Sequence, residues 1–134
     1  LDISATALER AKARLGERAE KVNWIVADIT DFKPDTSYDV WHDRAAFHFL
    51  TDNEQIEKYL NIVHAAVTGF LLIGTFSEDG PKKCSGLEIK QYSGTSLENL
   101  FKRDLKKIAC KTENHITPFN TIQNFTFCSL KRNE

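Results

Sequence analysis

The sequence has 134 residues, which is the size of one ordinary domain. Hydrophobic residues make up 41% and charged residues 28%, so the composition is that of a globular protein and excludes a disordered or collagen-like chain. The formal net charge of -1 creates no field that would attract nucleic acid or an anionic membrane. We therefore predict a single domain, residues 1–134, with neither nucleic acid nor a membrane as a partner.

No targeting or disulfide pattern is recognisable. The longest apolar run, residues 69–76, is far shorter than the roughly 20 residues needed to cross a bilayer, and there is no secretory leader. The three cysteines, Cys84, Cys110 and Cys128, are widely spaced and form no CxxC pair. This predicts reduced thiols in a cytoplasmic protein and no metal site. Because the chain contains no Met and opens in what reads as the end of one element and the start of another, we expect an N-terminal piece to precede it.

Two elements are predicted before the first turn. A helix over residues 5–15 follows from the N-cap Ser4, from an apolar helical stripe and from Gly16, a residue type at which helices commonly end. Residues 22–29 (VNWIVADI) are apolar and β-branched with a carboxylate at the far end, a pattern typical of a buried parallel strand.

The middle of the chain predicts strand, helix and strand. A short strand at residues 38–41 runs into a polar segment, residues 42–44, where we expect a reactive or binding loop. Thr51 or Asp52 caps a helix with apolar residues at i, i+3, i+4 and i+7, which ends near residues 68–69. Residues 70–76 are a third apolar strand.

The C-terminal part begins with a loop over residues 77–86, which is rich in Gly and Pro. Thr95 and Glu98 form a capping box that predicts a helix over residues 95–106. Residues 108–112 and 125–130 predict a closing antiparallel pair of strands.

This alternation predicts an α/β layered fold with a mainly parallel sheet and antiparallel strands at its C-terminal end. Ligands of such sheets bind beyond the carboxyl ends of the strands. Polar residues occupy that position at Asp2, at Asp28, at residues 42–44 and at residues 75–79. We expect them to line one crevice.

Those positions resemble the class I S-adenosylmethionine-dependent methyltransferases over nearly the whole chain. The opening Leu-Asp-Ile-Ser is similar to the acidic end of that family's second strand, which implies that Asp2 accepts from the ribose hydroxyls of the cofactor and that Ile3 lies beside it. The segment Ala-Asp-Ile-Thr at residues 27–30 matches the motif after the third strand. It implies that Asp28 accepts from the adenine amino group and that Ile29 packs on the ring.

The fourth strand makes the resemblance more specific. Residues 38–50 (YDVWHDRAAFHFL) resemble a bacterial subfamily with the pattern WHDRAxFHFL and, more distantly, the Trp-Asp-Arg-Gly segment of thiopurine S-methyltransferases. The order of later segments also fits that subfamily, namely GTF at 74–76, GP at 80–81, CSGL at 84–87, YS at 92–93, HITP at 115–118 and FTFC at 125–128. The resemblance implies a Rossmann-like sheet, with His42 and Asp43 at the cofactor and Arg44 and His48 at the methyl acceptor.

One departure from the family pattern concerns the glycine-rich loop after the first strand, which has no counterpart in this sequence. We therefore expect the methyltransferase domain to be N-terminally incomplete, without its first strand. The chain alone should be inactive, should bind the cofactor poorly, and should aggregate or exchange strands through its unpaired edge.

Each site residue also has a simpler interpretation. Asp2 and Asp28 would cap the turns that follow them, and residues 42–44 would be a surface ion cluster in which Arg44 pairs with Asp43 or Asp2. His48, between two phenylalanines, would be a packing residue.

The function that the resemblance implies is methyl transfer from S-adenosylmethionine to a small molecule, for instance a thiol, or to a side chain. In-line displacement at an activated carbon needs orientation more than a catalytic group, so no catalytic residue is predicted. The alternatives are a non-catalytic methyltransferase-like scaffold and an NAD-binding oxidoreductase, and the closing antiparallel pair argues against the second. The oligomeric state and the acceptor stay open.

Overall fold

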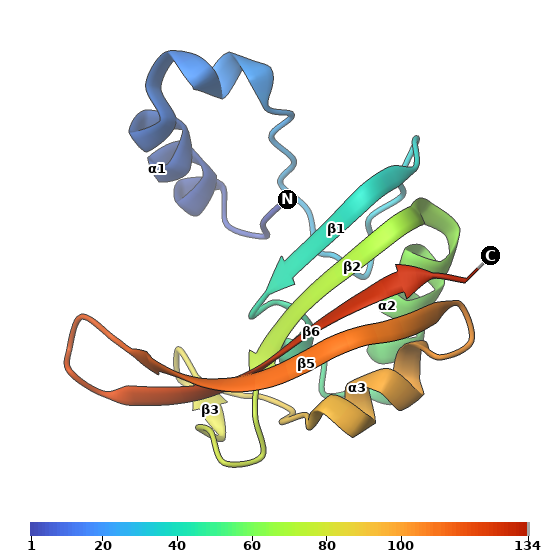
Figure 1. Cartoon of the computed structure of the whole chain (residues 1–134). Coiled ribbons are helices and arrows are strands. Elements are labelled where there is room, and N and C mark those ends of the chain that lie inside the picture. The colour runs from blue at the N-terminus through green and yellow to red at the C-terminus, as the bar shows by residue number, and fades with distance from the viewer. Residues whose placement is uncertain (134) are drawn as a thin grey trace. The chain divides into compact units, whose positions relative to one another are not determined.

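The computed structural model describes residues 1–133, and the chain divides into two compact units, Leu1–Lys33 and Pro34–Glu134. The first unit contains α1 (Ala5–Leu15) and a 3₁₀ helix, η1 (Gly16–Lys21) (Figure 1). As predicted, the Ser4 hydroxyl accepts a hydrogen bond from the Ala7 amide, and the helix ends at Gly16, whose φ of 61° suits glycine.

The predicted strand at residues 22–29 is reduced to an extended segment with one parallel bridge, between Asp2 and Val26. The Asp2 amide donates to the Ile25 carbonyl and the Ala27 amide donates to the Asp2 carbonyl, both at 3.1 Å. Within this unit no longer ladder forms, and Val26 remains 58% exposed. The apolar pattern of residues 22–29 thus predicted a full strand where the structure has a single bridge.

The second unit is built on a four-stranded mixed sheet in the order β1-β2-β6-β5. Its strands are β1 (Tyr38–Arg44), β2 (Val67–Phe76), β5 (Leu105–Ile116) and β6 (Ile122–Arg132). Strands β1 and β2 run parallel, whereas β6 is antiparallel to both of its neighbours. The loop between β2 and the next helix contains a small hairpin, β3 (Lys83–Cys84) and β4 (Leu87–Glu88). The predicted α/β class and the antiparallel closing pair are confirmed.

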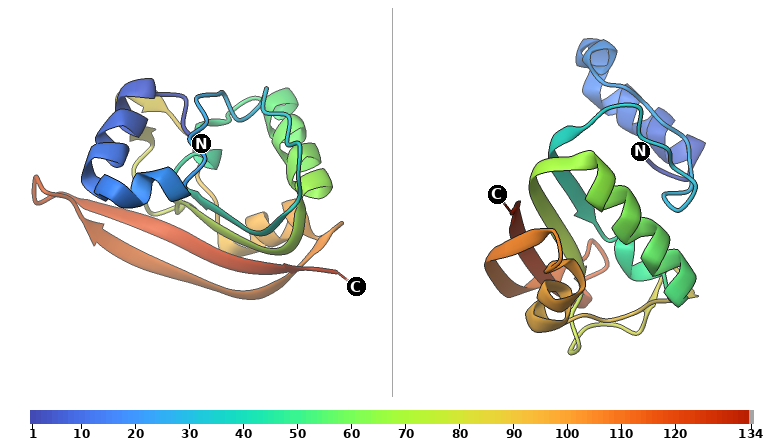
Figure 2. Two further views of the ribbon diagram at one scale, coloured as in Figure 1. Left: turned by 90° about the horizontal axis from the view of Figure 1, so that it is seen from above. Right: turned by 90° about the vertical axis from the view of Figure 1, so that its right-hand side faces the viewer.

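Two helices, α2 (Asn53–Ala66) and α3 (Gly94–Phe101), cover one face of this sheet (Figures 1 and 2). The core lies between them and the strands, and its fully buried side chains include those of Tyr59, Leu71, Ile73, Leu97 and Leu130. The residues that alternate with these core positions on β2 point to the opposite face, where Phe70 and Leu72 are each 39% exposed. The sheet is therefore apolar on both faces, and we call the face that no helix of the second unit covers the open face.

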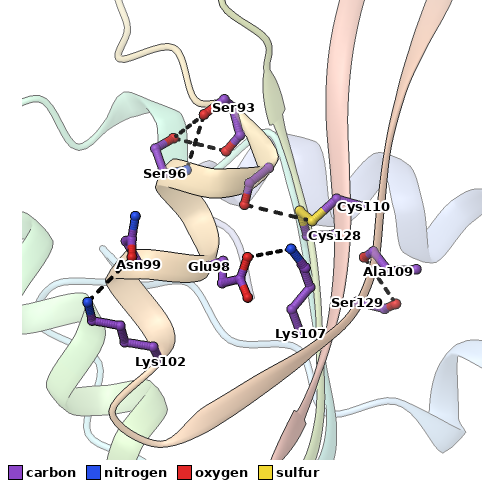
Figure 3. Close-up of polar contacts among 11 residues, drawn as sticks. Ser93, Ser96, Glu98, Asn99, Lys102, Lys107, Ala109, Cys110, Cys128 and Ser129 are labelled. Atoms are coloured by element: carbon purple, nitrogen blue, oxygen red, sulfur yellow. Dashed lines mark hydrogen bonds and ion pairs between the residues drawn. A yellow bond between two sulfur atoms is a disulfide. The ribbon is translucent and has the colours of Figure 1, made fainter.

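Helix α3 differs from the prediction at both ends. Its N-cap is Ser93, whose hydroxyl accepts from the Ser96 amide at 3.1 Å, and the predicted partner Glu98 pairs instead with Lys107 of β5 (Figure 3). The helix ends at Phe101 because Leu105 already pairs with Arg132 in the sheet. By contrast, Asp52, one of the two predicted caps, caps α2 and accepts from the Glu54 and Gln55 amides.

Residues 42–44, predicted as a loop, are the last three residues of β1. Residues 68–69, predicted as the end of a helix, lie in β2, which begins at Val67. In both places the strand continues because a neighbouring strand offers backbone hydrogen-bond partners. The local sequence, a short run of polar or small residues, does not predict that pairing.

The prediction of three reduced cysteines is wrong for two of them. Cys110 of β5 and Cys128 of β6 are direct cross-strand partners, with Cα atoms 4.1 Å apart, and form a disulfide (Figure 3). Cys84 is free. The pairing depends on the register of the closing hairpin, which a sequence separation of 18 residues does not determine. Within residues 1–133, no helix is long and apolar enough to cross a membrane.

Candidate cofactor and substrate site

Two predicted cofactor residues, Asp2 and Asp28, end the bridged segments of the first unit. Oδ1 of Asp2, an exposed residue, accepts from the Ser4 amide at 2.8 Å. Oδ1 of the half-buried Asp28 accepts from both the amide and the hydroxyl of Thr30, each at 2.8 Å. Each carboxylate thus caps its own turn with one oxygen, and no residue in the described chain donates to the other oxygen.

This arrangement fits the adenosine part of S-adenosylmethionine. The bridge between Asp2 and Val26 places the two carboxylates on neighbouring segments, and their second oxygens remain available as acceptors for hydroxyl or amino hydrogens. The side chain of Ile3 is 70% exposed and Ile29 is half-buried, so both have apolar surface for a planar base. The capping interpretation and the cofactor interpretation are therefore compatible.

The second unit brings together the carboxyl ends of β1 and β2. Arg44 lies opposite Gly74 in the parallel register, and the next residue, Ala45, donates its amide to the Gly74 carbonyl at 2.8 Å. Ala45 has a φ of 61°, a left-handed conformation that a non-glycine residue rarely adopts. The chain therefore makes a sharp and well-defined turn at this edge of the sheet.

His42 and Arg44 point to the open face, because both are exposed and alternate with the buried Asp43. They line a groove of about 560 Å³ together with Leu72 and Gly74 of β2, Lys111 of β5 and Phe127 of β6. The Arg44 guanidinium carbon lies 5.9 Å from the centre of the Phe125 ring, which stacks on Phe127 with centroids 5.4 Å apart. Arg44 does not pair with Asp43, whose side chain points to the other face.

Asp43 has a different environment from the one predicted for a cofactor contact. It is 6% exposed, and its Oδ1 accepts from the amides of Ala46 and Phe47 at 3.0 and 3.2 Å. Its Oδ2 accepts from the Tyr59 hydroxyl of α2 at 2.7 Å. Burial, followed by the charge of Asp43, raises the pKa of Tyr59 well above its usual value, so the phenol stays protonated and acts as the donor.

His48, predicted to contact the acceptor, is fully buried in the core. Its Nδ1 accepts from the Phe76 amide at 3.1 Å, and its ring packs on Phe49 and Phe76 with centroids 4.8 and 4.6 Å away. Burial lowers the pKa of His48 to about 4, so the imidazole is neutral near pH 7. This environment is that of a packing histidine and leaves no direct access for a substrate.

Tyr59 is the residue that sequence reasoning missed. It occupies the i+3 position of the apolar stripe predicted for its helix, but its hydroxyl donates to Asp43 and also accepts from Trp41 Nε1 at 3.2 Å. Its spacing within α2 indicated burial and carried no sign of a partner 16 residues earlier in the chain. Among the described residues, no three His, Cys, Asp or Glu side chains are grouped closely enough to hold a metal ion.

The fold is that of the class I methyltransferases. The N-methyltransferase NodS from Bradyrhizobium japonicum WM9 superposes with a TM-score of 0.73 at 14% sequence identity, covering 99% of this chain and 71% of NodS. The 1,6-didemethyltoxoflavin-N1-methyltransferase from Burkholderia thailandensis, crystallised with 1,6-didemethyltoxoflavin and S-adenosylhomocysteine, gives 0.66 at 15% identity, over 95% of this chain and 56% of that enzyme.

The sequence places the chain within a family. Residues 1–68 of the 134 match the family model described as a methyltransferase domain, and the chain belongs to this family. Solved proteins of this fold, NodS and the Burkholderia enzyme among them, have been crystallised with S-adenosylhomocysteine. A malonyl-[acyl-carrier protein] O-methyltransferase from Ilyobacter polytropus is 33% identical over 60 residues, which are 45% of this chain and 22% of that enzyme. The chain thus matches about a fifth of the length of this curated relative.

Proposed function

We propose that this protein transfers a methyl group from S-adenosylmethionine to a small-molecule acceptor. The observation that carries the proposal is the pair of carboxylates in the first unit, each of which keeps one oxygen available beside its own turn. Asp2 accepts from the ribose hydroxyls, Asp28 accepts from the adenine amino group, and Ile3 and Ile29 pack on the base. Membership of the methyltransferase-domain family supports this assignment.

The cofactor supplies a methyl group that its sulfonium has already activated. The chain then has to bind and orient the acceptor and to exclude water, so the proposal needs no general base. This agrees with the burial of His48, the one histidine that the sequence placed near the acceptor. We also propose a cytoplasmic location.

Arg44 is our candidate for holding the acceptor. Its guanidinium carries a planar fork of donors that suits an anionic acceptor such as a carboxylate or a thiolate. Arg44 is exposed in the groove and forms no ion pair with Asp43, which binds Tyr59 instead. This supports acceptor binding over the alternative in which Arg44 only pairs with Asp43. His42, which the resemblance assigns to the cofactor, lines the same groove. The names of the similar enzymes give acceptors as different as malonyl-[acyl-carrier protein] and 1,6-didemethyltoxoflavin, so we propose only that the acceptor carries a negative charge.

Calorimetry of the complete protein with S-adenosylmethionine and S-adenosylhomocysteine tests the proposal. We expect binding of both, and we expect Asp28→Ala to weaken it by about 1 to 3 kcal/mol, the range for a lost hydrogen bond to a charged group. Asp31→Ala is the matched control, because Asp31 is an exposed carboxylate of the same turn.

Unchanged affinity in a folded Asp28→Ala protein would remove this residue from the site. No heat with either compound for the unmodified protein would favour the alternative function, a methyltransferase-like scaffold that no longer catalyses.

A further inference from the structure

A buried hydrogen-bond network joins the turn after β1 to helix α2. Trp41 donates to the Tyr59 hydroxyl, which donates to Asp43, and Asp43 in turn accepts from the amides of Ala46 and Phe47. Tyr59 is fully buried and Asp43 is 6% exposed. A carboxylate in such a place is costly unless its oxygens are occupied, and here both of them are.

The sheet and the network together fix the backbone on the two sides of Ala45. On one side, β1 is held by its ladder to β2. On the other side, the two amides bound to Asp43 open the 3₁₀ turn η2 (Phe47–Phe49), and Phe47 is fully buried against Tyr59 with ring centroids 4.7 Å apart. Ala45 is thereby kept at a φ of 61°, which an unrestrained alanine would leave. The residue whose direction this turn determines is Arg44.

We propose that Asp43 is a positioning residue that, braced by Tyr59, holds the Arg44–Ala46 turn and so directs the Arg44 guanidinium toward the methyl acceptor. Asp43 then acts through the backbone and touches neither cofactor nor acceptor. This inference rests on the proposed function, because it concerns the orientation of the residue proposed to bind the acceptor.

Amide hydrogen exchange in the complete protein tests the holding step. Tyr59→Phe keeps the ring and removes the brace, so we expect the amides of Ala46 and Phe47 to exchange about tenfold faster, the factor that corresponds to one lost hydrogen bond. Tyr92→Phe is the matched control, because Tyr92 is also buried but its hydroxyl has no partner among residues 1–133. Equal acceleration at core amides such as those of Leu71 and Leu130 would show a general loss of stability and would overturn the proposal.

Labelling of Arg44 with phenylglyoxal, followed by peptide mass spectrometry, tests the directing step without an acceptor. We expect its rate to change at least threefold in Tyr59→Phe and to stay constant in Tyr92→Phe. Asp43→Asn keeps an oxygen for the two amides, so its effect should be smaller than that of Asp43→Ala. An unchanged Arg44 rate in both Tyr59→Phe and Asp43→Ala would overturn the proposal.

Steady-state kinetics connects the network to function, with benzoate and benzenethiolate as acceptor probes. Where either probe is methylated, Tyr59→Phe should raise its KM severalfold while kcat and the affinity for S-adenosylmethionine stay constant. A KM no different from that of Tyr92→Phe would contradict the positioning role. Failure of the unmodified protein to bind S-adenosylmethionine would instead refute the proposed function, and the exchange and labelling results would still decide whether Asp43 holds and directs the turn.

Discussion

Neighbouring polar residues of the segment WHDRAAFH have opposite environments. His42 and Arg44 are exposed in a groove, whereas Asp43 and His48 are buried and bound to the chain itself. Strand alternation separates the first three of these residues, because adjacent side chains of a strand point to opposite faces. The composition of the segment indicated a functional site, but only some of its polar groups are accessible to a ligand.

The buried imidazole of His48 predicts a specific dependence of stability on pH. Its pKa of about 4 in the folded chain is below the value of 6.5 that an unperturbed histidine has. As the pH falls below 6.5, the unfolded chain binds a proton that the folded chain does not, so stability is lost between pH 6.5 and about 4. The loss amounts to about 3 kcal/mol, since each unit of pKa difference corresponds to about 1.4 kcal/mol.

His48→Asn should remove this part of the pH dependence, because it keeps an acceptor for the Phe76 amide and does not titrate. Urea unfolding at pH 7, 5.5 and 4 measures the difference. Thr75→Val, a change at a buried polar neighbour without a titrating group, should shift the free energy of unfolding equally at all three values. Parallel curves for the unmodified protein and His48→Asn would show that His48 is not the residue responsible.

At the scale of elements, local signals predicted helices better than they predicted strands. Helix α1 and the start of α2 depend on caps and stripes within a few residues, and both were predicted correctly. Ser93 caps α3 in place of the predicted Thr95. The helix ends at Phe101, earlier than predicted, because β5 begins at Leu105. The strand expected at residues 22–29 forms one bridge, because strand formation depends on a partner strand that the local sequence does not specify.

The Cys110–Cys128 disulfide makes a prediction about the closing hairpin. Thiol titration of the unfolded chain without reductant should find one thiol, that of Cys84, and three after reduction. Cys110→Ser should lower the free energy of unfolding by about 3 kcal/mol, as expected for a loop of this length, and Cys84→Ser should leave it unchanged.

A count of three thiols without reductant would contradict the disulfide. Since a disulfide is unusual in a reducing cytoplasm, the same measurement also bears on the proposed location.

At the scale of the whole molecule, the open face of the second unit predicts self-association of residues 1–134 produced alone. Val40, Phe70 and Leu72 expose apolar surface on that face, and β1 is an edge strand in the described sheet. Sedimentation equilibrium should show a concentration-dependent increase in mass. Leu72→Lys should shift the distribution toward the monomer, because it charges this face.

Leu87→Lys provides the control for that experiment. Leu87 is 61% exposed in the small β3–β4 hairpin, away from the sheet face, so charging it should leave the association unchanged. A chain that stays monomeric at all concentrations would contradict the prediction.

The sequence by itself determined the α/β class, the helical faces, most of the caps and the two carboxylates at Asp2 and Asp28, because each depends on residues close together in the chain. Only the tertiary structure decided the Cys110–Cys128 pairing, the burial of His48 and the bond from Tyr59 to Asp43. These depend on strand register and on which side chains meet across the core. Register shifted by one residue would exchange the faces of every side chain on a strand, and no local pattern within WHDRAAFH specifies that choice.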